Sequence, residues 1–370
     1  MLEGWAHTSP AQQIVAGPSA LDALPDVLRS LGIKRALLVT TKGRRATEAG
    51  ERVVQRLARA HCATVDSVEV NVPAPSVQRA VAELRSSGAD GLVSLGGGSA
   101  VDTAKALAFF AEHEAGAPGS GFADRPLLPH IAIPTTLVGA PYTSTFSMVD
   151  PHARRSTTTG GPTTTPAAVV IDLDVAADLP VSHLATSIAV ALAHGIEAVW
   201  SATATPEAAA VGLAGLRHLA AAASGAVEEP DDLERRAAIL TAAMLCGRAR
   251  QNVGDGLQQA LAQLVGARGA ASHAAAHMAL LVPTTRFLAE AVSAEVARSV
   301  AGALGGTDDP ADAVGALLDR LGGVPRLAEL GVNDDDLDAV ARQSGSQRGV
   351  QTAARPVGET DVRALLDDAS

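Results

Sequence analysis

A short apolar run followed directly by three glycines, GLVSLGGGSAVDTAK at residues 91–105, decides the fold class of this chain. The apolar run is typical of a buried strand, and the residues after the glycines are typical of a helix. Glycines at such a turn let backbone N–H groups approach an anion closely, and the helix N-terminus adds a favourable dipole. The spacing is neither G-x-G-x-x-G nor a Walker loop. We interpret the loop as a phosphate cradle, which Asp102 and Lys105 favour; the alternative is a plain turn capped by Ser99.

The same alternation of strand and helix continues on both sides of the loop. Strands are expected at residues 35–41, 64–72, 91–95, 130–134 and 168–174, and helices at 46–60, 77–87 and 99–110. Alternation at this spacing predicts an N-terminal α/β domain, residues 1–178, with a doubly wound, Rossmann-like parallel sheet. After residue 174 no convincing strand remains, and Ala-rich helical patterns continue to the end. An all-α C-terminal domain is therefore expected over residues 179–370.

Composition and charge exclude several classes of partner. The 370 residues include 29 Lys and Arg against 40 Asp and Glu, a net charge of −11. This balance argues against nucleic acid, whose affinity rests on Lys and Arg contacts, and against an anionic membrane surface. Two cysteines, Cys62 and Cys246, are too few for a disulfide framework or a cysteine metal cluster. With neither a signal-peptide pattern nor a run of about 20 apolar residues, we expect a cytoplasmic protein that acts on a small molecule.

Several motifs carry a resemblance to a known family. GGGSAVDTAKALA at residues 96–108 resembles the nucleotide-binding signature of the iron-containing alcohol dehydrogenase superfamily, and IPTTLVGA at 133–140 resembles its second signature. Five shorter motifs occur along the chain in the same order as in the maleylacetate reductases of that superfamily. They are RAL at 35–37, AHGIEA at 193–198, LCG at 245–247, HAAAH at 273–277 and RPV at 355–357. The resemblance covers essentially the whole chain. It implies a dehydroquinate synthase-like fold, an α/β nucleotide-binding domain followed by a helical domain, and a homodimer.

The resemblance also implies which residues bind a nicotinamide cofactor. The pyrophosphate would be held by Gly96, Gly97, Gly98 and Ser99 with Asp102 nearby, and the nicotinamide ribose would lie beside Thr135 and Thr136. Ordinary strand-end capping is the alternative for the two threonines. Thr41 stands in a loop, residues 39–45, where dinucleotide enzymes often place an acidic residue for the ribose 2′-hydroxyl. This loop has no acid and three basic residues, so it favours NADPH at least as much as NADH.

The metal site of the family is incomplete in this sequence. By resemblance, metal-dependent members use an Asp and a His one helical turn apart, because i and i+4 side chains share a face, and two later histidines. The corresponding residues here are Val190, His194, Gln263 and His273. Valine has no ligating atom, and an amide oxygen is a poor replacement for imidazole. The resemblance therefore implies that a functional iron or zinc site is absent and that the enzyme is metal-independent.

Three histidines, His194, His273 and His277, are the candidate catalytic residues. A histidine on an Ala-rich helix is otherwise an ordinary packing residue, and that is the alternative for each. By resemblance, relatives without a strict metal requirement polarise a carbonyl with imidazoles, a general-acid role that suits a pKa near 6.5. Gln258 and Gln259 stand where maleylacetate reductases have two histidines. The pocket has thus lost positive charge that a dicarboxylate such as maleylacetate needs.

These features together predict a metal-independent NAD(P)H-dependent reductase. Hydride would pass from the cofactor to a carbonyl or activated alkene of a small molecule, with His194 or His273 protonating the product. Two alternatives stay open. Loss of half of the metal ligands is also what a fold repurposed for a lyase, dehydratase or cyclase step would show. A non-catalytic nucleotide-binding subunit is the other alternative, which the three retained histidines disfavour.

Overall fold

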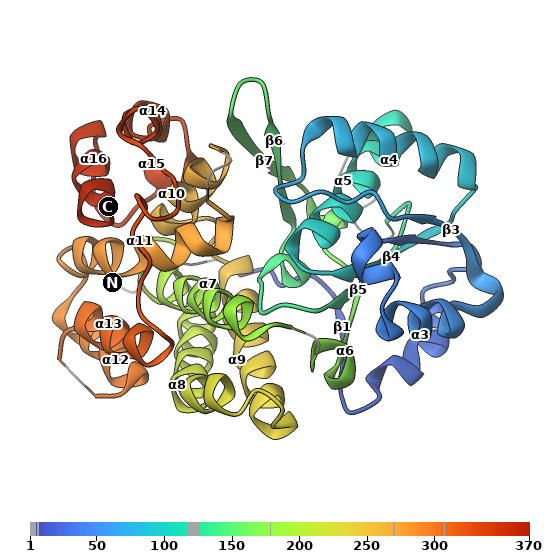
Figure 1. Cartoon of the computed structure of the whole chain (residues 1–370), viewed down its shortest axis with the longest axis horizontal. Helices are drawn as coiled ribbons and strands as arrows, with labels where there is room; N and C mark the ends of the chain where they lie inside the picture. The colour runs from blue at the N-terminus through green and yellow to red at the C-terminus, as the bar shows by residue number, and fades with distance from the viewer. Residues whose placement is uncertain (1–4, 6, 117–125, 178, 269–270, 307) are drawn as a thin grey trace. The chain divides into compact units, whose positions relative to one another are not determined.

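The computed structural model describes residue 5 and residues 7–116, 126–177, 179–268, 271–306 and 308–370 (Figure 1). The chain divides into two compact units. Residues 10–179 form the first, which we name the α/β unit, and residues 180–370 form the second, the helical unit. The described residues 7–9 belong to the helical unit, where the His7 ring lies 2.8 Å from the Thr205 hydroxyl and 3.1 Å from a carboxylate oxygen of Glu207.

A parallel six-stranded sheet is the centre of the α/β unit. Its order is β1 (Gln13–Gly17), β8 (Ala168–Asp172), β5 (His130–Pro134), β4 (Gly91–Gly96), β2 (Ala36–Val39) and β3 (His61–Val65). The four inner strands are buried on both sides, because helices cover both faces of the sheet. The helices of this unit are α1 (Leu24–Ser30), α2 (Lys42–Arg45), α3 (Glu48–Leu57), α4 (Ala74–Ser87), α5 (Gly98–Glu114) and α6 (Leu173–Ala177).

Two apolar clusters lie on the two faces of this sheet. One cluster joins α1 and α3 to the sheet, with Leu24 and Val53 among its buried residues together with Val93 of β4. The other joins α4 and α5 to the opposite face, with Leu84 and Leu107 packed beside Leu92 of β4. Successive residues of a strand point to opposite faces, so Leu92 and Val93 belong to different clusters. The doubly wound α/β domain that the sequence predicts is thereby confirmed.

Several elements differ from the sequence-based expectation. The strand expected at 64–72 is β3 (His61–Val65); Asn71 and Val72 have positive φ angles of 62° and 52°, which interrupt an extended chain. The expected helix 46–60 is α3, which begins where the Thr47 hydroxyl accepts the Gly50 N–H. Neither the edge strand β1 nor the antiparallel hairpin of β6 (Thr145–Asp150) and β7 (Arg155–Gly160) was expected.

The helical unit is built around α7 (Val181–Trp200), most of whose residues are buried. It is followed by α8 (Pro206–Glu228), α9 (Leu233–Gln251), α10 (Leu257–Gly266), α11 (His273–Ala289), α12 (Ala294–Leu304), α13 (Pro310–Arg320), α14 (Asp334–Ser344), α15 (Arg348–Gln351) and α16 (Glu359–Asp368). Helix α8 is long and apolar enough to cross a membrane by length and composition, and here it packs against α7, α9 and α12. The all-helical second domain is confirmed.

Small residues bring α7, α8 and α9 close together. A Cβ at Gly195 would lie 2.8 Å from Leu216 and 2.9 Å from the Cys246 sulfur, and a Cβ at Gly215 would lie 2.7 Å from the same sulfur. Burial raises the pKa of the Cys246 thiol to about 12, so it stays protonated and packs as a small apolar group. This close packing holds α7 rigidly, and α7 carries His194.

Candidate functional site

In the glycine-rich loop between β4 and α5, no Cβ atoms cover the backbone. Gly96 has a φ of 149°, a conformation that favours glycine, and a Cβ there would lie 2.9 Å from the Ala100 Cβ. A Cβ at Gly97 would lie 3.0 Å from the Thr136 hydroxyl oxygen. Gly97 is also the N-cap of α5, with no side-chain cap, so Ser99 lies inside the first turn rather than capping it. The first-turn N–H groups of α5 are therefore free of side-chain caps, as an anion site requires.

The end of β5 adds a hydroxyl beside this loop. Thr135 donates its N–H to the Gly96 carbonyl at 3.0 Å, which ties the two strand ends together. The neighbouring Thr136 hydroxyl oxygen is buried and has no hydrogen-bond partner among the described residues. An unsatisfied buried hydroxyl costs about 1–3 kcal/mol, and a polar ligand group at the loop would remove that cost.

Lys105, which supported the phosphate cradle in the sequence, has a structural role instead. Its side chain is fully buried, and its Nζ donates to the Thr143 hydroxyl at 3.1 Å and to the Thr145 carbonyl at 2.8 Å. Asp102 lies 3.7 Å from the same ammonium group and accepts the N–H of Ser147 at 3.4 Å. Asp102 and Lys105 thus fasten the β6–β7 hairpin to α5.

Thr41 lies at the carboxyl end of β2, the neighbour of β4 in the sheet. Its hydroxyl accepts the N–H of Arg44 at 3.1 Å and caps the single turn of α2. The adjacent Thr40 hydroxyl donates to the Leu95 carbonyl at 2.8 Å, one residue before the glycines. Three basic residues of α2, Lys42, Arg44 and Arg45, therefore follow the strand next to the loop, at the same edge of the sheet.

In the helical unit, three helices bring the three candidate histidines together around one amide. The side-chain oxygen of Gln259, on α10, lies 3.2 Å from Nε2 of His194 on α7 and 3.0 Å from Nε2 of His277 on α11. Since an amide oxygen can only accept, both imidazoles carry their proton on Nε2. The Gln259 amide nitrogen lies 3.4 Å from Nε2 of His273, also on α11. We name these four residues the imidazole cluster.

Packing and neighbouring hydrogen bonds fix the orientation of the rings. The His273 and His277 rings are nearly perpendicular with centroids 4.6 Å apart, and the His194 and His277 centroids are 6.0 Å apart. Gln258 donates its amide N–H to the His277 carbonyl at 2.8 Å and accepts a hydrogen bond from the Thr284 hydroxyl. Gln258 and Gln259 thus form the hydrogen-bonded frame of the cluster.

Burial keeps the imidazoles of the cluster neutral. It lowers the pKa of His194 and of His277 well below the usual 6.5, and the nearby positive charge of Arg250 lowers both further. It lowers the pKa of His273 to about 4, although part of that side chain stays accessible. The expectation of a pKa near 6.5 is therefore wrong for these residues. Near neutral pH they are hydrogen-bond donors and acceptors rather than imidazolium ions.

The two residues that the family resemblance places at substituted metal positions lie in neighbouring helices. Val190 and Gln263 are buried, on α7 and α10. Among the residues that the structure describes, no three or more His, Cys, Asp or Glu side chains are grouped to hold a metal ion. The donor set therefore does not fit the iron or zinc that the family resemblance implies.

Comparison with known proteins assigns the chain to a family. The iron-containing alcohol dehydrogenase model matches residues 11–173, and the model of the C-terminal part of the same family matches residues 184–370. This chain belongs to the iron-containing alcohol dehydrogenase family. It is 31% identical over 373 residues to the maleylacetate reductase of Rhizobium sp. (strain MTP-10005), covering 100% of this chain and 98% of the relative. It is 30% identical to that of Pseudomonas knackmussii, covering 98% and 97%.

Solved structures of the family agree with the assignment. The crystal structure of maleylacetate reductase from Agrobacterium tumefaciens matches with a TM-score of 0.85 and 28% identity, covering 100% of this chain and 98% of that one. A structure of 1,3-propanediol oxidoreductase matches with a TM-score of 0.89 and 26% identity over 100% of both chains. This member of the iron-containing alcohol dehydrogenase family is therefore an oxidoreductase by descent, and its fold is that of the family.

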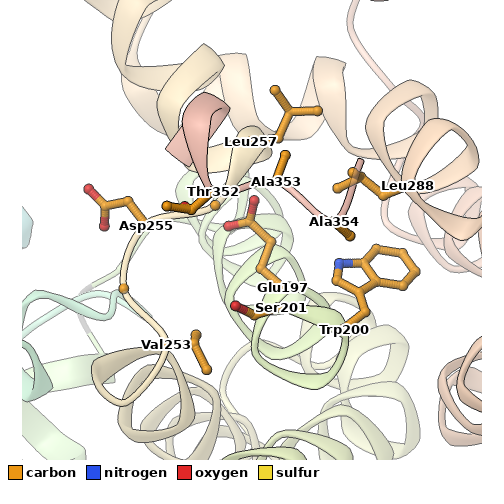
Figure 2. A pocket seen from close by; sticks show the side chains of 12 residues that line it. Glu197, Trp200, Ser201, Val253, Asp255, Leu257, Leu288, Thr352, Ala353 and Ala354 are labelled. Atoms are coloured by element: carbon orange, nitrogen blue, oxygen red, sulfur yellow. The ribbon is translucent and has the colours of Figure 1, made fainter. Parts of the chain in front are cut away.

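One acidic residue of this family member was not singled out from the sequence. Glu197, on α7, lines a small pocket in the helical unit together with Trp200, Asp255 and Leu257 (Figure 2). Burial raises the pKa of Glu197 to about 7, against the lowering effects of the Gln258 N–H and of Arg250. A sequence signal was present, because Glu197 follows His194 by three residues and shares its side of the helix.

Proposed function

We propose that this chain is a metal-independent NAD(P)H-dependent reductase that acts on a carbonyl or activated alkene of a small molecule, as the maleylacetate reductases do. The observation that carries the proposal is the meeting of two imidazole N–H groups, from His194 and His277, at the single carbonyl oxygen of Gln259. Two donors aimed at one carbonyl oxygen in a dry environment are what stabilises negative charge on that oxygen during reduction. A substrate carbonyl that displaces the Gln259 side chain would accept the same two hydrogen bonds.

The glycine-rich loop supports the cofactor part of the proposal. Gly96, Gly97, Gly98 and Ser99 would hold the pyrophosphate through backbone N–H groups, with Asp102 behind them. The hydroxyl of Thr136, which has no partner among the described residues, would hydrogen-bond the cofactor beside Thr135. The turn at Thr41 would face the adenosine ribose. When bound, the reduced nicotinamide supplies the hydride. The basic residues of α2 suit NADPH at least as well as NADH, since a 2′-phosphate gains from Arg and Lys.

Metal independence rests on the chemistry of the substituted positions. Val190 offers no ligand, and the Gln259 side chain already lies beside His194 and His273, the two histidines at the metal positions that the resemblance implies. His194 and His277 would instead polarise the substrate as neutral donors, with His273 beside them. We further propose that the protein is cytoplasmic and, as the family resemblance implies, a homodimer.

Calorimetric titration of NADH and NADPH into chelator-treated protein, followed by turnover assays, tests this function. We expect micromolar binding of at least one cofactor without metal, and oxidation of that cofactor by members of a panel of small carbonyl compounds that includes maleylacetate. Turnover that appears only after iron or zinc is added would disprove metal independence. If neither cofactor binds, the reductase proposal fails, and a lyase, dehydratase or cyclase step becomes the better hypothesis.

A further inference from the structure

Two buried polar atoms on neighbouring turns of α7 lack hydrogen-bond partners. Oε2 of Glu197 and the indole nitrogen of Trp200 have none among the residues that the structure describes. Only 4% of Glu197 and 5% of Trp200 is exposed, so bulk solvent does not satisfy these atoms. Side chains three residues apart on a helix are neighbours, so the carboxyl group and the indole lie on the same side of α7. Folded proteins pair nearly all such atoms, and this unpaired acceptor and donor therefore indicate a bound group.

Both side chains line a pocket in the helical unit, and Figure 2 shows the indole nitrogen of Trp200 on the side of Glu197. The pocket has a volume of about 20 Å³, which holds about one water-sized group. Gly254 and Thr352 also line it and are exposed, so the pocket reaches the surface of the helical unit. Its apolar lining residues are Val253, Leu257, Leu288, Ala353 and Ala354.

The two unpaired atoms select a group that both donates and accepts hydrogen bonds. An ionised carboxyl oxygen only accepts, and an indole N–H only donates. A hydroxyl group satisfies both, because it has one O–H donor and two acceptor lone pairs. Those two lone pairs also serve if Glu197 is protonated, so the fit does not depend on its ionisation.

Other classes of ligand fit this pocket less well. An ammonium ion has no acceptor for the N–H of Trp200, and the positive charge of Arg250 already acts on Glu197. An anion would meet the carboxylates of Glu197 and Asp255, which line the pocket. A purely apolar group would leave both buried polar atoms unsatisfied. The chemistry of the lining therefore favours a neutral hydroxyl group.

We propose that this pocket binds the hydroxyl end of a small neutral molecule, with the hydroxyl oxygen between Glu197 and Trp200. The short carbon chain of the ligand would lie among Val253 and Ala353, which adjoin the exposed Gly254 and Thr352. Water offers the same hydrogen bonds, and the ligand gains over water by removing its carbon atoms from solvent. None of the described lining residues belongs to the glycine-rich loop or the imidazole cluster, so the inference goes beyond the proposed reductase.

The same carboxyl group holds the start of α10. Oε1 of Glu197 accepts the N–H of Gln258 at 2.7 Å, in the first turn of that helix. Gly256 is the N-cap and provides no side-chain cap, and a Cβ there would overlap the Glu197 carboxylate. A ligand on Oε2 restricts the rotation of the carboxyl group and so steadies the hydrogen bond at Oε1. Occupancy of the pocket therefore orders the first turn of α10, the helix that carries Gln259.

Tryptophan fluorescence measures binding in the pocket directly. The chain has two tryptophans, so Trp5→Phe, at an exposed site, leaves Trp200 as the only indole. In this background we expect ethylene glycol to shift the emission saturably, with a Kd of about 1–100 mM for a ligand of so few atoms. 1,2-Dimethoxyethane, which cannot donate, and ethylammonium chloride, whose cation cannot accept, should give no saturable shift. Saturation by either of these two probes, or by none of the three, would overturn the proposal.

Two variants locate the bound ethylene glycol. Ala354→Leu fills the pocket and keeps both polar side chains, so we expect Kd to rise at least about tenfold. Ala221→Leu, exposed on α8, adds the same bulk elsewhere and should bind as its parent does. Trp200→Phe removes the indole N–H, and saturation-transfer NMR of ethylene glycol should show about fivefold weaker binding. An unchanged Kd in both Ala354→Leu and Trp200→Phe would place the ligand outside the pocket and overturn the proposal.

Amide hydrogen exchange tests the connection to α10. At a saturating concentration of ethylene glycol, we expect exchange to slow in peptides that contain Gln258 and Gln259, because the ordered Glu197 carboxyl group holds the first turn. Peptides of α4, in the α/β unit, are the control and should exchange at the same rate with and without the ligand. Unchanged exchange at the start of α10 while Trp200 is saturated would show that occupancy of the pocket does not order this helix.

Discussion

The amide oxygen of Gln259 accepts a hydrogen bond from Nε2 of His277 at 3.0 Å, in the interior of the helical unit. His194 makes the equivalent contact at 3.2 Å, so one neutral amide oxygen accepts the Nε2 protons of two buried imidazoles. Where a metal ion would bind several histidine nitrogens as a Lewis acid, Gln259 binds them as a hydrogen-bond acceptor. The ring nitrogens that face the Gln259 oxygen therefore carry protons. A metal ion would instead need a lone pair on each of those nitrogens.

Replacing Gln259 with leucine should destabilise the helical unit. The substitution leaves two buried N–H groups without an acceptor, each costing about 1–3 kcal/mol. Urea unfolding followed by circular dichroism measures the change. Gln351→Leu, exposed at the end of α15, is the control, and we expect it to change stability by less than about 0.5 kcal/mol. Equal stability of the two variants would show that the hydrogen bonds of Gln259 do not stabilise the imidazole cluster.

Gly97→Val should abolish nucleotide binding while the protein stays folded. The new side chain would press on Thr136 and cover the N–H groups at the start of α5, which approach the pyrophosphate. Isothermal titration with NADH and NADPH measures the loss, which we expect to exceed about 100-fold in Kd. Ala115→Val, exposed at the far end of the same helix, adds comparable bulk and should bind as the parent does. Unchanged affinity in Gly97→Val would disprove the assignment of the glycine-rich loop to pyrophosphate binding.

Restoring the two substituted positions should create metal binding. In the double variant Val190→Asp and Gln263→His, His194 and His273 gain the carboxylate and imidazole that the family resemblance implies. We expect the double variant to retain about one equivalent of zinc or ferrous ion after dialysis, measured by elemental analysis, and the parent protein to retain none. Val190→Asp alone is the control, because three ligands of this kind with Gln259 among them should hold metal more weakly. Stoichiometric metal in the parent protein would contradict the metal-independent proposal.

The buried imidazoles should make stability fall in acid. His277 has a folded pKa well below 6.5, so below pH 6.5 the unfolded chain binds more protons than the folded one. Its contribution is present above pH 6.5 and is lost as the pH falls toward 4. We expect His277→Gln to show a shallower loss of unfolding free energy between pH 6.5 and 4.5 than the parent, measured by urea unfolding. His218→Gln, exposed on α8, should keep the parent slope; parallel slopes in all three proteins would refute the burial argument.

Much of the fold could be read from local patterns. The strands β2, β4 and β5 are short, continuously apolar and followed by turn residues, and the glycines after β4 mark a backbone that no side chain can cover. Strand β1 and the β6–β7 hairpin were not predicted because their residues are largely half-buried or exposed and so give no continuous apolar run. That Val190 has no ligating atom and Gln263 only an amide can be read directly from the sequence, because side-chain chemistry does not depend on the fold.

Local sequence patterns predict the α/β and helical halves and the glycine loop between β4 and α5. The contacts among the candidate site residues become visible only in the folded chain. His194, Gln259 and His277 come from three helices, and Glu197 reaches back to cap α10 from α7. Lys105, which favours the phosphate cradle in the sequence, is buried and donates to Thr143 and Thr145. Hydrogen bonds and burial between distant segments depend on packing, and packing sets the protonation of each group, which no local pattern records.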